Sequence, residues 1–311
     1  MSDRTSRVRR ILAAVDAWWR ADAPPQRLAA LRMLVGGFAT IYVAARLVHL
    51  ISFIDFPTHN FAPVGVVSLL SHPLPAPLVI AGVVLTLVLA PAFTLGWRFR
   101  VTGPAFAFAL LWVLSYRNSW GMVFHTENLL VIHALVLGLT RSADAWSLDA
   151  RHARLPITPP PHAHGWPVRL LALVTVATYV LAGVAKLRLS GLAWIDSDLL
   201  RNYIAYDNLR KLELGDAYSP IGAALVRHGW LFPPLAATSL ALELLAPIAL
   251  LGPRLARAWA LGAWGFHVGV LAVMAIFFPY PLSGLGFAPL FQVERLPLWR
   301  WLGLRAPADA T

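Results

Sequence analysis

Long apolar runs divide the chain, and most polar residues lie between them. A helix needs about 20 residues to cross a bilayer, and most of the runs are close to that length. The pattern therefore predicts an all-α, multi-pass integral membrane protein with about 7–8 transmembrane helices. The runs are residues 28–53, 77–97, 101–116, 127–140, 167–186, 232–252 and 257–280.

A further apolar stretch, residues 282–293, is too short for a simple span. It is either a tilted eighth helix or a re-entrant segment packed inside the protein, because non-helical backbone at membrane depth must be buried in protein. The number of crossings is therefore seven or eight.

The first twenty residues predict an amphipathic helix lying on an anionic membrane surface. Asp16 interrupts the apolar stretch and Arg20 follows it, so we do not expect a cleavable signal peptide. The apolar positions, which recur at helical spacing among arginines, are Ile11, Leu12, Val15, Trp18 and Trp19.

A second amphipathic segment is expected within residues 187–231, capped by Asp196 or Ser197. It would lie as a lid across the outer mouth of the protein. The residues expected to line one side of this helix are Leu199, Leu200, Tyr203, Ile204 and Leu209.

The pattern divides the chain into three parts. Residues 1–26 form a basic amphipathic segment, residues 27–293 a transmembrane domain, and residues 294–311 a short tail. Within the domain, the loop 150–166 contains Pro156 and three consecutive prolines from Pro159, which predicts an extended linker.

Composition agrees with the hydropathy pattern. Of the 311 residues, 58% are hydrophobic and 13% are charged, and the mean hydropathy is +0.64. Such a chain could hardly cover a water-exposed surface, which excludes a soluble enzyme, a disordered chain and a collagen-like fibre. There is no cysteine, which excludes disulfides and thiolate metal sites.

The net charge of +11 reflects arginines between the apolar runs. Fourteen lysines and arginines fall in the terminal segment and loops of one side and six on the other. The positive-inside rule therefore places the amino terminus in the cytoplasm, with the chain in the cell (plasma) membrane. The basic residues form no stripe, so no nucleic-acid partner is expected.

Lys186 is the most informative ionisable residue within the apolar runs. The chain has two lysines and 24 arginines, and Lys186 ends a long apolar run. A buried lysine can lose its proton and act as a base, which an arginine cannot. The alternative is that Lys186 extends its ammonium to the outer head groups.

Glu243 and His267 form a second candidate pair. Each lies 12 residues from Leu255, near the expected turn of a helical hairpin, so both should reach a similar depth. They could relay a proton or hold a polar head group, or they could form an ordinary interhelical hydrogen bond. Gly265 and Gly269 have the spacing of close helix packing, which favours the second alternative.

His125 and Glu127 open the fourth run on the outer side. They are candidate ligand-binding groups, and the alternative is that Glu127 or its neighbours cap the helix. Arg46 and His49 share a helix face near the same mouth.

The histidines of the proline-rich loop do not indicate a metal site. They lack a carboxylate at ligand spacing and any cysteine, so we expect a solvated loop and no metal. These residues are His152, His162 and His164.

Several stretches resemble the HTTM (horizontally transferred transmembrane) family, whose bacterial members are similar to the membrane part of vitamin K-dependent gamma-carboxylase. The resemblance covers about residues 28–292. Its residues are Arg117-Asn118, the run from His125 to Leu130, Ser147-Leu148-Asp149, Trp166-Pro167, Tyr179 leading into Ala182-Gly183-Val184-Ala185-Lys186-Leu187, Trp194, Glu243 and Phe266-His267.

The resemblance implies a role for Lys186 as the base that deprotonates a membrane-soluble hydroquinone, in hydroquinone-linked oxygenation or lyase-like chemistry. His125 or His267 would orient the quinone ring. A quinone or hydroquinone is the cofactor thus implied. The implied partners are the lipid bilayer and a quinone-like lipid.

Only 18 residues follow Val293, too few for the carboxylase's domain that grips its protein substrate, so carboxylation of protein glutamates is not expected. The alternative function is a noncatalytic membrane scaffold or lipid-binding subunit.

Overall fold

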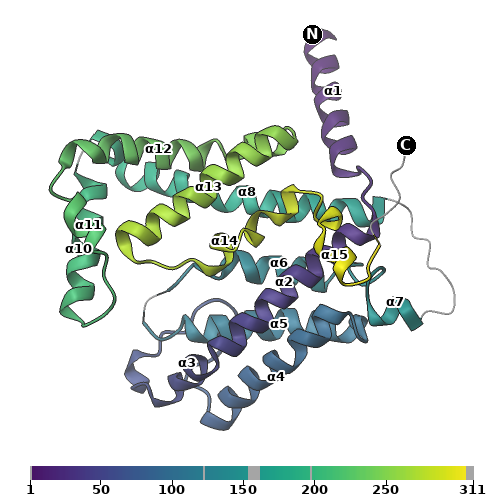
Figure 1. The fold of residues 1–311 in the computed structure, drawn as a ribbon, viewed down its shortest axis with the longest axis horizontal. Coiled ribbons are helices and arrows are strands. Elements are labelled where there is room, and N and C mark those ends of the chain that lie inside the picture. Colours follow the sequence, from purple (N-terminus) through teal and green to yellow (C-terminus); the bar gives the residue numbers. More distant parts are fainter. Residues whose placement is uncertain (1, 122, 153–161, 197, 306–311) are drawn as a thin grey trace. The chain divides into compact units, whose positions relative to one another are not determined.

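A computed structural model describes residues 2–121, 123–152, 162–196 and 198–305, and all of its regular elements in those ranges are helical (Figure 1). Its contacts divide the chain into two compact units, and each is described by itself. Unit 1 is Met1–Leu171 with Gln292–Thr311, and unit 2 is Ala172–Phe291. The division falls inside one long helix, α8 (His162–Ser190).

Unit 1 is built on a set of neighbouring helices in which α2 packs against α4 and α6, and α5 packs against α4 and α6 (Figure 1). Short 3-10 turns connect α3 to α4, and the chain returns to this unit after residue 291. The elements are α1 (Ser2–Trp19), α2 (Pro25–Ala45), α3 (Leu47–Ile51), η1 (Ser52–Asp55), η2 (Thr58–Asn60), η3 (Gly65–Leu69), α4 (Ala76–Leu95), α5 (Phe99–Arg117), α6 (Asn128–Gly138), α7 (Leu148–His152), η7 (Val293–Arg295) and α15 (Leu298–Trp301).

Two polar clusters show that successive helices of unit 1 alternate in direction. Arg32, near the start of α2, donates to the carbonyl oxygen of Thr94 at the end of α4 and to those of Ser142 and Trp146 after α6. At the opposite end, Tyr42 of α2 bonds Glu127, which precedes α6. The start of α2 therefore lies with the ends of α4 and α6.

Unit 2 contains the rest of α8 and the elements that follow it. The side chains of Asn208 and Lys211 from α10 donate to the carbonyl oxygens of Val273 and Met274, so α10 is attached to the carboxyl end of α13. The elements are α9 (Ala193–Asp196), α10 (Leu199–Glu213), α11 (Pro220–Leu225), η4 (Gly229–Leu231), α12 (Phe232–Leu244), η5 (Ala246–Leu250), α13 (Pro253–Met274), α14 (Pro279–Leu282) and η6 (Leu285–Leu290).

Four of the described helices are long and apolar enough to cross a membrane, namely α2, α4, α5 and α8. Of the other expected spans, the fourth contains the 11-residue helix α6, and the seventh contains the continuous 22-residue helix α13. The first run breaks at Arg46, and the sixth changes from α-helix to 3-10 helix after Leu245. The stretch 282–293 is no continuous helix, since it holds the end of α14, then η6, with Pro289 inside η6.

The amphipathic segment of unit 2 differs from its prediction in detail. A helix is present, α10, but its buried residues are Ile204, Asn208 and Lys211. Tyr203 and Leu209 are exposed. Asp198, rather than Asp196, occupies the amino-terminal cap position, and Ser197 lies outside the described residues. The polar contacts of Asn208 and Lys211 to α13 decided which face is buried.

The proline-rich linker cannot be compared with its prediction, because Pro156 and the prolines from Pro159 lie outside the described residues. The solvated loop expected for the three histidines is wrong at His164. Its side chain is buried in the first turn of α8, with Nε2 2.9 Å from Asp144 Oδ2. A polar partner on the loop after α6 decides this burial.

Candidate functional site: the Lys186–Glu243 pair

One face of α8 carries the residues of this site. Tyr179, Gly183 and Lys186 are four and three residues apart, a spacing that places them on one side of a helix. Gly183 allows α12 to approach this face, since a Cβ atom at Gly183 would lie 2.9 Å from Leu244 Cδ2 and 3.1 Å from Glu243 Cβ. The glycine thus brings the end of α12 against Lys186.

Lys186 and Glu243 form a close ion pair between α8 and α12. Lys186 Nζ lies 2.5 Å from Glu243 Oε1, and the exposed fractions of the two side chains are 20% and 4%. The second oxygen, Glu243 Oε2, is buried and accepts no hydrogen bond from a described residue. The pair is therefore reachable from the lysine side and closed on the glutamate side.

Two aromatic rings flank the lysine ammonium. Lys186 Nζ lies 4.9 Å from the ring centre of Trp194 and 5.7 Å from that of Phe266. Trp194 is itself attached to α12, because its indole nitrogen donates to Ser239 Oγ at 3.4 Å. Aromatic faces attract cations, so the rings favour a protonated group at this position.

His267 contacts α8 two turns away from the ion pair. Its Nε2 lies 2.8 Å from the Tyr179 hydroxyl oxygen, among the rings of Trp259, Phe278 and Phe287. Glu243 and His267 therefore share no direct hydrogen bond, since each residue bonds a different turn of α8. We expected Glu243 and His267 at the same depth because each is 12 residues from the turn at Leu255, which assumes an α-helix on both sides of the turn. On the Glu243 side the chain includes η5, a 3-10 helix, which rises more per residue.

Glu127 belongs to a second buried cluster, in unit 1. Its carboxylate accepts hydrogen bonds from Tyr42 Oη at 2.6 Å, Arg117 Nη1 at 2.7 Å and Thr126 Oγ1 at 2.5 Å. Glu127 occupies the cap position of α6, but its side chain makes no capping bond, so capping does not explain it. His125 is exposed beside this cluster.

A comparison with protein families decides the identity of the fold. The model of the HTTM domain matches residues 21–292, most of the chain. This chain belongs to the HTTM family. No curated protein and no solved structure matches it. The family and the apolar helices together make it a membrane protein, and the resemblance to the HTTM family read from the sequence is confirmed.

The five predicted site residues of this HTTM domain fall into two groups. Lys186, Glu243 and His267 lie in unit 2, where the structure joins the first two directly. His125 and Glu127 lie in unit 1. The two groups are therefore described as two separate candidate sites.

Sequence reasoning missed several partners of these residues in the HTTM domain. Tyr179 was recognisable from its spacing to Lys186 along α8, and Trp194 and Phe266 from the aromatic positions of the resemblance. Arg117 was among the residues of the resemblance, and Tyr42 carried no such signal. Arg117 read as a loop charge, although its side chain is 7% exposed and paired with Glu127.

Proposed function

We propose that this HTTM domain binds a membrane-soluble hydroquinone and removes a proton from its hydroxyl group at the Lys186–Glu243 pair. The observation that carries the proposal is the 2.5 Å contact of a partly exposed lysine with a buried glutamate. The resemblance to the membrane part of vitamin K-dependent gamma-carboxylase supports the choice of ligand, and the proposal is confined to removal of the hydroxyl proton of the hydroquinone.

The proton transfers balance within the pair. In the resting pair, Lys186 is an ammonium and Glu243 a carboxylate. Transfer of one proton from Nζ to Glu243 makes both groups neutral, at a site where little water solvates the carboxylate. The neutral amine then takes the hydroxyl proton of the hydroquinone. This leaves a phenolate beside the ammonium, and the first proton on Glu243.

Nearby residues suit an aromatic ligand. Trp194 and Phe266 lie beside Nζ and offer faces on which a quinone ring can stack. His267, bonded to Tyr179 two turns along α8, is the histidine of this unit that would orient the ring. His125 and Glu127 would serve a ligand of unit 1.

The second candidate function is a noncatalytic scaffold or lipid-binding subunit. It is favoured by the same ion pair, because Lys186 and Glu243 join α8 to α12 and so hold two helices together. In that case the charges matter, but a proton never needs to leave the lysine.

The experiment compares Lys186→Arg with the wild type, using a membrane-soluble hydroquinone in detergent micelles and an oxygen electrode. The electrode follows the reaction of the phenolate with dissolved O2, the oxidant. Arginine keeps the charge opposite Glu243 but cannot act as a base, so this oxygen uptake should be lost while the protein stays folded. Lys211→Arg is the matched control, because Lys211 is the other lysine and binds the α13 carboxyl end. It should retain the activity.

Two results would contradict the enzyme proposal. Equal uptake by Lys186→Arg and the wild type would leave the scaffold function. Absence of both uptake and hydroquinone binding in the wild-type protein, with binding followed by native mass spectrometry, would reject the ligand itself.

We further propose that the domain lies in the cell membrane with its amino terminus in the cytoplasm. The alternation of α2, α4, α5 and α6 supports this, because it gathers Arg27, Arg98, Arg100 and Arg141 at one end of unit 1. An end rich in arginine is retained on the cytoplasmic side.

A further inference from the structure

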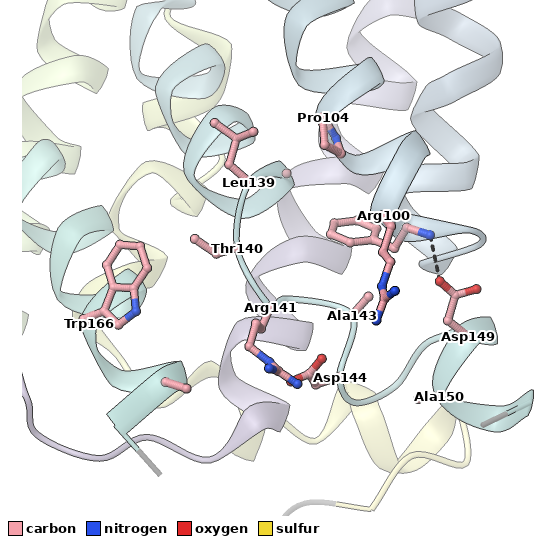
Figure 2. Close-up of a pocket in the computed structure, with 13 residues that line it drawn as sticks. Arg100, Pro104, Leu139, Thr140, Arg141, Ala143, Asp144, Asp149, Ala150 and Trp166 are labelled. Carbon is pink, nitrogen blue, oxygen red and sulfur yellow. Dashed lines mark hydrogen bonds and ion pairs between the residues drawn. The ribbon is translucent and has the colours of Figure 1, made fainter. Parts of the chain in front are cut away.

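A cavity of about 970 Å³ opens at the arginine-rich end of unit 1, far along the chain from Lys186. It is lined by the start of α5, the end of α6 and the loop after it, α7, and the first turns of α8. Figure 2 shows Trp166 facing Arg100 and Pro104 across the cavity, with Leu139 and Thr140 between them. Small-molecule sites have volumes of about 300–1,000 Å³, so the cavity can hold a ligand.

The acidic groups of the cavity are already engaged. Asp149 accepts the backbone N–H groups of Arg98 at 2.8 Å and Phe99 at 2.7 Å. Asp144 Oδ2 lies 2.7 Å from Arg141 Nε and 2.9 Å from His164 Nε2. Burial raises the pKa of Asp144, but the hydrogen bonds of His164 and Arg141 outweigh it, so that the pKa lies below its ordinary value. Asp144 is thus a carboxylate held by its own partners.

Unused guanidinium donors remain in this cavity, whose lining carries two arginines and two aspartates. Arg100 is exposed and has no ion pair with a described residue. Arg141 is 44% exposed and uses its Nε on Asp144, which leaves its terminal nitrogens for another acceptor. Two guanidinium groups at one rim match a phosphate, which arginine binds through paired hydrogen bonds.

The remaining lining is apolar. Leu139 is 58% exposed and Trp166 36% exposed, and Phe99 and Pro104 complete the wall from α5. Tryptophan at the end of a spanning helix is typical of the membrane interface. A cavity with free guanidinium donors at its rim and apolar walls at this depth fits a molecule with a phosphate and acyl chains.

We propose that this cavity binds one anionic phospholipid, with its phosphate on Arg100 and Arg141 and its chains along Leu139 and Pro104. Basic pockets between membrane helices on the cytoplasmic side bind anionic head groups by the same chemistry. The site is independent of the Lys186–Glu243 pair and of any reaction there.

The experiment uses the full-length protein, stripped of lipid in detergent and titrated with phosphatidylglycerol, with bound lipid counted by native mass spectrometry. The wild type should retain one phosphatidylglycerol and no comparable phosphatidylcholine. Arg100→Gln should weaken the binding by about tenfold, the loss of one charge-assisted contact. Arg254→Gln is the matched control, since it removes an exposed arginine of unit 2 that is expected on the same side.

Leu139→Asp is a second variant that keeps both arginines. It places a carboxylate in the cavity wall at an exposed position, so it should repel the phosphate without disturbing the fold. An equal loss for Arg254→Gln and Arg100→Gln would overturn the proposal, and so would unchanged binding by Leu139→Asp. Displacement of the lipid by an equal concentration of glycerol 3-phosphate would instead assign the cavity to a soluble phosphate compound and overturn the lipid.

Discussion

At the scale of single residues, buried charged side chains have specific hydrogen-bond partners. The guanidinium of Arg32 is fully buried and donates to three carbonyl oxygens, those of Thr94, Ser142 and Trp146. Gly96, at φ +64°, leaves room for it, since a Cβ there would lie 2.7 Å from Arg32 Nη1. A buried charge lowers the stability of the fold little while it keeps its partners, and much more when one partner is removed.

The Arg117–Glu127 pair tests this difference between a buried charge with its partner and one without it. Glu127→Ala leaves Arg117 buried without its counter-charge, so the free energy of unfolding should fall by about 3–5 kcal/mol. Tyr42→Phe removes one hydrogen bond to the same carboxylate and should cost about 1 kcal/mol. Denaturant titration in detergent micelles measures both. A loss below about 1 kcal/mol for Glu127→Ala would show that Arg117 finds water or another acceptor.

At the scale of elements, glycines set how closely helices approach. Gly103 of α5 and Gly138 at the end of α6 face each other, and a Cβ at Gly138 would lie 2.6 Å from the Gly103 carbonyl oxygen. Gly265 and Gly269 of α13 have the spacing expected for close packing, but a Cβ at either would meet nothing within 4 Å. Spacing alone therefore did not identify the packed glycines.

Gly138→Ala should accordingly destabilise the protein by about 1–3 kcal/mol, because the methyl group meets backbone that cannot rotate away. Gly269→Ala should be neutral or stabilise α13 by up to about 1 kcal/mol, since alanine is the better helix former. Thermal unfolding of the two variants, followed by circular dichroism in the same detergent, gives the comparison. Equal melting temperatures would contradict the α5–α6 contact.

At the scale of the whole molecule, orientation in the membrane follows from the placement of arginines. The chain has no cysteine, so single-cysteine variants report topology without background. We expect His72→Cys, in the arginine-free first loop, to react with a membrane-impermeant maleimide on intact cells. Val8→Cys, on the exposed face of α1, should react only after permeabilisation. The reverse pattern would invert the proposed orientation.

The sequence by itself determined the class of protein, the expectation of helices at most of the runs, the family, and Lys186 as the unusual residue. Hydropathy and composition are local properties, and they can be read without knowing any contact. The structure decided which polar groups meet: Glu243 bonds Lys186 rather than His267, and Glu127 bonds Tyr42 and Arg117. Those pairings depend on helix register and on interruptions such as η5, and both arise only when the helices pack.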